Sequence, residues 1–132
     1  MSEPDWLTRE IIIAIHDEQL AAHGGASGLR DMGLLESALD RPRNRWRYEK
    51  TNLAELAAAY AFAIARNHPF VDGNKRTALL ALYTFLGING IDFRVTEPDA
   101  AAMILALAAG EVNEQGLTQW ISDNWPEPPA PP

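Results

Sequence analysis

Two apolar segments rich in Ala and Leu constrain the fold of this chain more than any other feature of its sequence. In residues 53–67, apolar side chains recur three and four positions apart, which places them on one face of an α-helix. The same spacing returns in residues 77–86. The stretch HPFVDGNKR, residues 68–76, connects the two segments. The sequence therefore predicts two buried helices joined by a polar loop.

Further helices are predicted from the same spacing and from residues that favour helix ends. Thr8 can cap a helix that stops at His23-Gly24-Gly25, since glycine accepts the left-handed conformation common just past a helix end. Asn52, followed three residues later by Glu55, resembles a capping box for the helix over 53–67. We expect six helices, over residues 9–23, 32–40, 53–67, 77–86, 97–109 and 113–125.

Two segments set the limits of this assignment. Arg41-Pro42 should end the second helix at Asp40, because the residue before proline is pushed out of helical geometry. Residues 91–95, IDFRV, alternate apolar and polar side chains and predict a short extended strand, too short to imply a sheet. The predicted fold is all-α, a compact single-domain bundle of about six helices over residues 1–125, with at most a short extended hairpin or strand. Residues 126–132, PEPPAPP, predict a proline-rich disordered tail.

Composition and charge exclude several classes of protein. The 132 residues match one ordinary domain, and the net charge of -7 has the wrong sign for general binding to a phosphate backbone. Cysteine is absent, so neither disulfides nor thiolate metal sites are expected. The N-terminus lacks the basic start and apolar run of a secretion signal, and no stretch reaches the ~18 apolar residues of a membrane span. We expect a soluble cytoplasmic protein with no membrane partner and no direct nucleic-acid partner.

The second apolar helix is expected to begin as an anion-binding site. Gly73-Asn74 leaves backbone N–H groups free at the positive end of the helix dipole. Lys75 and Arg76 lie in the first turn, where cations oppose the dipole and cost stability unless an anion meets them. Taken alone, each of these residues is ordinary for a helix start or a solvated surface. Together they indicate a bound phosphate.

The residues just before this helix supply the remaining parts of a transfer site. Asp72 offers the hard oxygen ligand that Mg²⁺ prefers, usually beside the phosphates of a nucleotide. His68 can accept a hydroxyl proton at cytoplasmic pH. Pro69 and Phe70 are expected to anchor the loop on the core. Taken alone, His68 could be a packed histidine and Asp72 a helix cap. These explanations do not account for the occurrence of all these residues at one helix start.

HPFVDGNKR resembles the signature of the Fic/Doc family. The pair Asn-Lys, in place of the Asn-Gly of the larger Fic group, makes it similar to the Doc branch, the death-on-curing toxins of bacterial toxin–antitoxin pairs. The stretches GLRDMGLLESAL at 28–39 and TALLALYTFLGING at 77–90 are similar to the same family. The resemblance covers roughly residues 5–125.

The resemblance implies a fold, an activity and partners. A Doc-type toxin transfers the γ-phosphoryl group of ATP, with Mg²⁺, to a Ser or Thr hydroxyl of a target protein, and a translation elongation factor is the family's known type of target. Its partner is a separate antitoxin protein. The implied roles are general base for His68, Mg²⁺ ligand for Asp72, triphosphate binding for Gly73, Asn74, Lys75 and Arg76, and a flap that docks the target for Ser27, Gly28, Leu29 and Arg30.

Two positions favour phosphoryl transfer over the AMP transfer of other Fic members. Those members need room for phosphates where this chain has Lys75, and they carry a second arginine where it has Leu79. AMP transfer remains the alternative, because Leu80 replaces a polar residue found in the toxin that gives the branch its name. The inhibitory helix of many Fic proteins has its nearest match at residues 51–56, which fails at Leu56. This failure is a second reason to expect a separate antitoxin.

Three other classes of function stay open from the sequence. A metal phosphohydrolase of HD type could use His16-Asp17 with His23, His68 and Asp72, although His16-Asp17 on an amphipathic helix is more often ordinary surface. A non-enzymatic helical interaction module is the second possibility. The third is nucleic-acid binding through RPRNRWR, residues 41–47, for which a protein-docking surface is the more common explanation.

Overall fold

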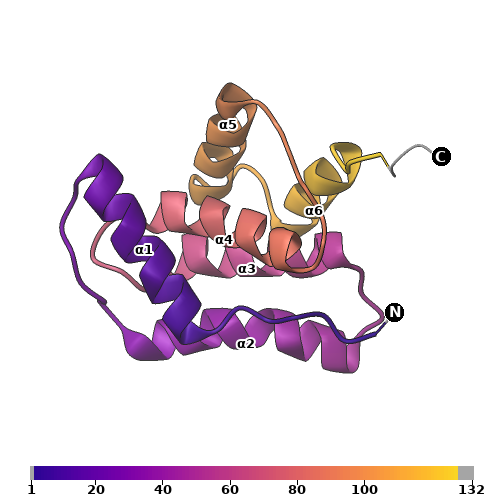
Figure 1. Ribbon diagram of the computed structural model, residues 1–132, viewed down its shortest axis with the longest axis horizontal. Helices are drawn as coiled ribbons and strands as arrows, with labels where there is room; N and C mark the ends of the chain where they lie inside the picture. Colours follow the sequence, from indigo (N-terminus) through magenta and orange to yellow (C-terminus); the bar gives the residue numbers. More distant parts are fainter. Residues whose placement is uncertain (1, 128–132) are drawn as a thin grey trace.

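The computed structural model describes residues 2–127, and that part of the chain is all-α, as predicted. Figure 1 shows α3 and α4 through the middle of the molecule, α2 on one side of them, α5 and α6 on the other, and α1 across the end of the pair. The helices are α1 Arg9–His23, α2 Met32–Tyr48, α3 Leu53–Asn67, α4 Asn74–Ile88, α5 Glu97–Ala108 and α6 Glu114–Asp123.

Helix α3 is the centre of the bundle. It packs against α2, α4, α5 and α6, and most of its residues are buried. Ala57, Ala58 and Ala61 are fully buried and small, which lets the neighbouring helices approach closely, while Tyr60 and Ile64 fill the remaining space. The C-terminal end of this helix is therefore a rigid support for the loop that follows it.

Local capping fixes the helix starts that the sequence predicts. The Thr8 side chain accepts a hydrogen bond from the Ile11 N–H at 3.2 Å. Asn52 and Glu55 form the predicted capping box, with bonds of 2.9 Å and 3.2 Å. Thr96 caps α5. These three predictions are confirmed.

The predicted end of the second helix at Asp40 is wrong, because α2 continues through Pro42 to Tyr48. Proline has no N–H to donate to the carbonyl one turn back, which normally ends a helix. Here contacts with other elements hold the last turns in place. Arg45 forms ion pairs with Glu55 at 3.0 Å and Glu114 at 2.9 Å, and Trp46 packs edge-on against Trp6 with ring centroids 6.5 Å apart.

The alternating segment 91–95 forms no strand, and no other strand occurs within residues 2–127. Extended backbone needs a neighbouring strand to satisfy its hydrogen bonds, and none lies beside this segment. Its buried residue, Phe93, packs instead against Tyr83 and Trp120, with ring centroids 5.9 Å and 5.7 Å apart.

The last residues of the chain are only partly described. Pro126 and Glu127 follow α6 outside any helix, and the rest of the predicted proline-rich tail, residues 128–132, lies outside the described residues. Across the described range, none of the helices has the length and apolar character needed to cross a membrane.

Candidate functional site

Two loops meet at one end of the bundle. The loop between α1 and α2 and the loop between α3 and α4 both lie at the left of Figure 1. The N–H groups of Arg30 and Asp31 donate to the Pro69 carbonyl at 2.7 Å and 3.0 Å, and the Val71 N–H donates to the Gly28 carbonyl at 3.0 Å. The predicted flap thus pairs with the HPFVDGNKR loop through its backbone.

Members of the predicted flap have different environments. Leu29 forms an isolated antiparallel bridge with Phe70, and Ser27 is exposed. The Arg30 guanidinium turns back to α3, where Nε donates to the His68 carbonyl at 2.6 Å and Nη2 to the Asn67 carbonyl at 2.8 Å. An arginine at a helix C-terminus satisfies carbonyls that have no partner in the helix. Arg30 therefore fixes the backbone that carries His68.

His68 terminates α3 in an unusual conformation. It is the C-cap residue, with φ 50° and ψ 57°, and no other non-glycine residue of the described chain has a positive φ. The left-handed region disfavours side chains, and such strain persists where surrounding contacts impose it. The side chain is exposed at the end of the bundle. It is thus accessible to a hydroxyl group from another protein.

The middle of the loop is anchored in the core. Pro69 and Phe70 are buried, and the Phe70 ring stacks on the His16 imidazole with centroids 3.8 Å apart and planes at 7°. The buried Asn74 side chain accepts from the Phe70 N–H at 3.0 Å and donates to the Phe70 carbonyl at 2.9 Å. Since both ends of the Asn74 amide bond to the loop, its backbone N–H is the part left for a ligand.

Asp72 lies between the two loops. Its Oδ1 accepts from the Gly73 N–H at 2.8 Å, its Oδ2 accepts from the Ala26 N–H at 3.3 Å, and the residue is exposed. The described residues contain no group of three or more His, Cys, Asp or Glu side chains that could hold a metal ion. A single exposed carboxylate nevertheless fits Mg²⁺, which takes one or two carboxylates together with substrate phosphates.

The start of α4 combines free N–H groups with two cations. Gly73 is the N-cap, with φ 77°, and no side chain of the described residues caps this end. Lys75 and Arg76 are exposed in the first turn. Arg76 Nη1 donates to His23 Nε2 at 2.9 Å. The arrangement has the features of a candidate anion site, with Arg76 held against α1.

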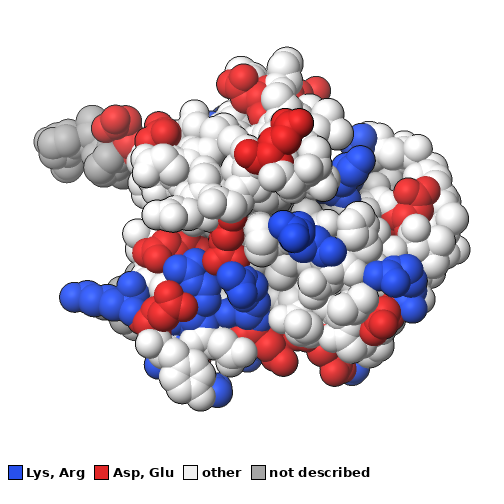
Figure 2. All heavy atoms as spheres, turned by 180° about the vertical axis from the view of Figure 1, so that it is seen from behind, with Lys and Arg blue, Asp and Glu red and all other residues white. Residues whose placement is uncertain are grey.

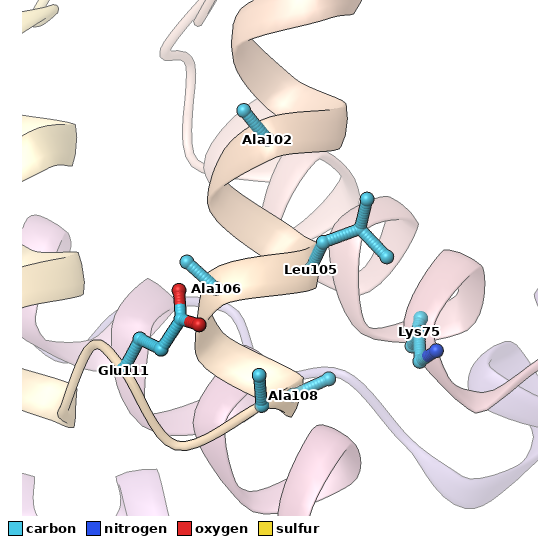
Figure 3. Close-up of a pocket in the computed structure, with 7 residues that line it drawn as sticks. Lys75, Ala102, Leu105, Ala106, Ala108 and Glu111 are labelled. Atoms are coloured by element: carbon cyan, nitrogen blue, oxygen red, sulfur yellow. The ribbon is translucent and has the colours of Figure 1, made fainter.

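Lys75 borders a pocket of about 470 Å³ beside α5. Figure 3 shows its side chain on α4, across from Leu105 of α5. The other residues that line the pocket are Ala102, Ala106, Ala108, Ala109 and Glu111. Lys75 therefore belongs both to the first turn of α4 and to the wall of this pocket.

Helix α1 contributes polar side chains that the sequence analysis did not assign to the site. His16 was expected at the surface but is only 1 % exposed, because its ring is covered by Phe70 and bonds to the Asp72 carbonyl at 2.7 Å. Gln19 is also buried. Together with His23 they lie on one face of α1, and that spacing was the signal available in the sequence. His16 is thereby committed to the loop, which removes a ligand from the HD-type alternative.

Two other segments considered in the sequence analysis have structural roles. In the arginine run, Arg41 and Arg45 form ion pairs with Glu114. On the face of the molecule drawn in Figure 2, Lys and Arg side chains gather directly beside acidic ones. The neighbouring negative charges reduce the attraction of these cations for nucleic acid. In the nearest match to an inhibitory helix, Glu55 completes the capping box and pairs with Arg45, so it is not free to contact the site.

Comparisons with known proteins find relatives of this chain. The family model described as "Fic/DOC family" matches residues 6–86. The chain is 38% identical over 116 residues to "Protein kinase doc" of Escherichia phage P1, which covers 87% of this chain and 91% of the relative. It is 42% identical over 91 residues to "Toxin Doc" of Mycolicibacterium smegmatis, which covers 66% of each.

Proposed function

The chain belongs to the Fic/DOC family, on its Doc branch, and from this premise we propose that it is a toxin that phosphorylates a target protein. The reaction transfers the γ-phosphoryl group of ATP to a Ser or Thr hydroxyl. The observation that carries the proposal is the loop at 68–76, where an exposed histidine, an exposed carboxylate and an uncapped helix start with two cations follow one another. A translation elongation factor is the proposed target, and a block of translation the consequence.

The proposed chemistry needs one proton acceptor and one anion site. His68 takes the proton of the target hydroxyl as the oxygen forms a bond to the γ-phosphorus. The bond between that phosphorus and the β–γ bridging oxygen breaks, and ADP leaves. The strained but fixed backbone of His68, held by Arg30, keeps the imidazole at the end of α3. Positioning of this kind supplies much of the catalysis in phosphoryl transfer.

The remaining residues neutralise charge on the nucleotide. Lys75, Arg76 and the free N–H groups at the start of α4 bind the phosphates, since these groups are charged or polarised to meet an anion. Asp72 would hold Mg²⁺, which supplies charge neutralisation at the phosphates when bound. The flap, paired with the loop backbone, offers an edge along which a segment of the target can lie.

Phosphoryl transfer is favoured over AMP transfer by the side chains of α4. Lys75 places a long cation where an AMP-transferring site needs space. Leu79 is half-buried against the core, so the position of a second arginine holds an apolar contact. Leu80 is half-buried as well. AMP transfer to a protein hydroxyl is the second candidate.

Label transfer tests the reaction directly. The purified protein is incubated with a bacterial lysate and either γ-labelled or α-labelled ATP, with His68→Ala as the matched control. We expect protein label from the γ position alone and none with the variant. Label from the α position would establish AMP transfer. No transfer, together with no rise in melting temperature on adding ATP and Mg²⁺, would favour a non-catalytic interaction module.

The proposed toxin should also have a separate antitoxin. In the segment nearest to an inhibitory helix, residues 51–56, Glu55 completes the capping box of α3 and pairs with Arg45. This pairing of Glu55 supports inhibition by a separate chain. We expect growth arrest when the protein is expressed alone in a bacterial host, and relief of the arrest by His68→Ala.

A further inference from the structure

One face of α1 contacts successive parts of the phosphate-binding loop. His16 bonds to the Asp72 carbonyl, Gln19 packs against Gly73, and His23 bonds to Arg76. We propose that His16 and His23 are positioning residues of the transfer reaction, which hold the Asp72 carboxylate and the Arg76 guanidinium where magnesium and phosphate are bound. This inference rests on the proposed function, because it assigns further residues to the same site.

The His16 contact fixes the backbone of Asp72. A carbonyl oxygen only accepts hydrogen bonds, so the ring must donate its Nε2–H across the 2.7 Å contact. On the other side of the ring, Nδ1 is 3.8 Å from the Asp17 carboxylate, too long for a hydrogen bond. The ring is 1 % exposed and stacked on Phe70. A buried ring with one possible orientation holds the Asp72 peptide rigidly.

The position of the Asp72 peptide sets the direction of its carboxylate. Oδ1 accepts from the next N–H in the chain, that of Gly73, and Oδ2 accepts from Ala26. The Gly73 N–H belongs to the same peptide as the Asp72 carbonyl, so the Asp72 carboxylate holds one side of this peptide and His16, bonded to the carbonyl, holds the other. Loss of the His16 donor would leave a partly buried carbonyl without that partner and loosen the segment that carries the proposed metal ligand.

The Gln19 contact sets the closest approach between α1 and the loop. Its amide nitrogen occupies the place that a Cβ at position 73 would take. Within residues 2–127 this buried nitrogen has no hydrogen-bond partner. Gln19 therefore keeps α1 and Gly73 in direct contact, and that contact places His16 and His23 one turn away on either side.

The His23 contact restrains Arg76. A guanidinium has no acceptor, so Arg76 donates in this contact and His23 Nε2 accepts. Nε2 is therefore a donor in His16 and an acceptor in His23. Arg76 is exposed, and a long exposed side chain loses conformational entropy when it is fixed on a ligand. Its contact with His23, the last residue of α1, reduces that loss. This matters because Leu79 stands where other Fic members carry a second arginine.

Two substitutions at each position separate positioning from simple packing. His16→Phe keeps the stack on Phe70 but removes the donor, whereas His16→Gln returns an amide donor at about the same reach. His23→Leu removes the acceptor, and His23→Gln restores one. Glu18→Gln, on the exposed face of α1, is the matched control. The readout is the rise in melting temperature with a non-hydrolysable ATP analogue, titrated against Mg²⁺ and against the analogue.

The two histidines should affect different parameters. We expect His16→Phe to raise the Mg²⁺ concentration at half-effect by about tenfold or more, as is typical when a group that orients a metal ligand is removed. His23→Leu should weaken analogue binding by roughly tenfold, the loss of about one hydrogen bond to a charged group, with the Mg²⁺ midpoint unchanged. The Gln variants should remain close to the wild-type protein. Equal losses in Phe and Gln variants, or no loss in either, would overturn the proposal.

Hydrogen exchange without nucleotide gives a second, independent answer. His16→Phe should accelerate exchange of the Gly73 amide and of residues 70–76, while α3 and α6 keep their protection. Unchanged exchange in this loop overturns the role of His16. If the wild-type protein binds no nucleotide at any Mg²⁺ concentration, the proposed function fails, and the exchange result alone still decides whether α1 orders the loop.

Discussion

His68 is the proposed general base, and its backbone lies in the left-handed region, which residues with a side chain disfavour. Glycine adopts the left-handed region without that cost, although it loses more entropy on folding. We therefore expect His68→Gly to be more stable than His68→Ala by about 0.5–1 kcal/mol, measured by urea denaturation. Both variants should lack transfer activity.

A comparison of Gly and Ala at this position isolates the backbone from the imidazole. Neither variant carries a base, so a difference between them reports the backbone alone, as the strain relieved by glycine minus its larger loss of entropy on folding. Equal stability would show that contacts such as the Arg30 bond to the His68 carbonyl hold an unstrained conformation. Activity retained in either variant would remove His68 as the base.

Two features of the structure exclude a Cβ atom at position 73 and so require glycine there. Its φ of 77° disfavours a side chain, and a Cβ there would overlap the Gln19 amide nitrogen. Gly73→Ala should therefore destabilise the protein by about 2 kcal/mol or more, in chemical denaturation. Adding Gln19→Ala should recover part of that loss, because it removes the overlap but leaves the strain. Additive losses in the double variant would contradict the contact.

At the scale of elements, the second half of α2 depends on one arginine. Arg45 side-chain atoms reach Glu49, Glu55 and Glu114, and the Arg45 side chain is only 18% exposed. Arg45→Ala would leave Glu49 and Glu55 without the ion pairs that the described residues give them, and Glu114 with Arg41 alone, so we expect a loss of about 2–4 kcal/mol in the free energy of unfolding. Hydrogen exchange should show the loss of protection first after Pro42, where the helix has one hydrogen bond fewer.

Arg47 is the control for this prediction. It lies two residues further along the same helix, is exposed, and contacts Tyr48 rather than an acidic side chain. Arg47→Ala should change stability by less than about 0.5 kcal/mol. If both variants behave alike, the ion pairs do not hold this part of α2, and burial of Pro42 and Trp46 must do so.

The helix ends that were predicted correctly depend on contacts between residues close in the sequence, and the one that was predicted wrongly depends on a distant contact. Thr8, Asn52 and Thr96 bond three residues along the chain, so their caps can be inferred from a short stretch of sequence. Arg45 meets Glu114, which is 69 residues away, and nothing local to Pro42 indicates that partner. Local signals therefore located most helix starts and missed the end of α2.

The same distinction applies to the candidate site. Residues 68–76 are contiguous, so their chemistry was visible in the sequence as one motif. His16 reaches Asp72 across 56 residues and Arg76 reaches His23 across 53. Those contacts exist only because α1 packs on α4, and the sequence gives the apolar face of α1 without its orientation.

At the scale of the whole molecule, the segment before α1 ties the bundle together. Trp6 stacks on Phe85 of α4 and packs edge-on against Trp46 of α2, with ring centroids 6.1 Å and 6.5 Å away. The next residue, Leu7, donates its N–H to the Tyr60 hydroxyl at 3.0 Å. Tyr60 belongs to the central helix and is fully buried. Global stability should therefore respond to this one hydroxyl group.

Burial raises the pKa of Tyr60 to about 12. In the unfolded chain the hydroxyl ionises near pH ~10. Between these values the folded state keeps a proton that the unfolded state releases, so stability is complete below pH ~10 and falls as the pH rises toward 12. The expected loss by the upper value is about 2–3 kcal/mol. Denaturation curves across this range should show it.

Tyr60→Phe tests this assignment because it removes the ionising group and keeps the ring. At neutral pH we expect a loss of about 1–2 kcal/mol, since the Leu7 N–H is left without its acceptor. Above pH ~10 the slope should flatten but not vanish, because burial also raises the pKa of Tyr83. Tyr48→Phe, at a residue 77% exposed, should leave both stability and slope unchanged. If the unfolding free energy of Tyr60→Phe falls with pH as steeply as that of the wild-type protein, groups other than Tyr60 cause the loss of stability at high pH.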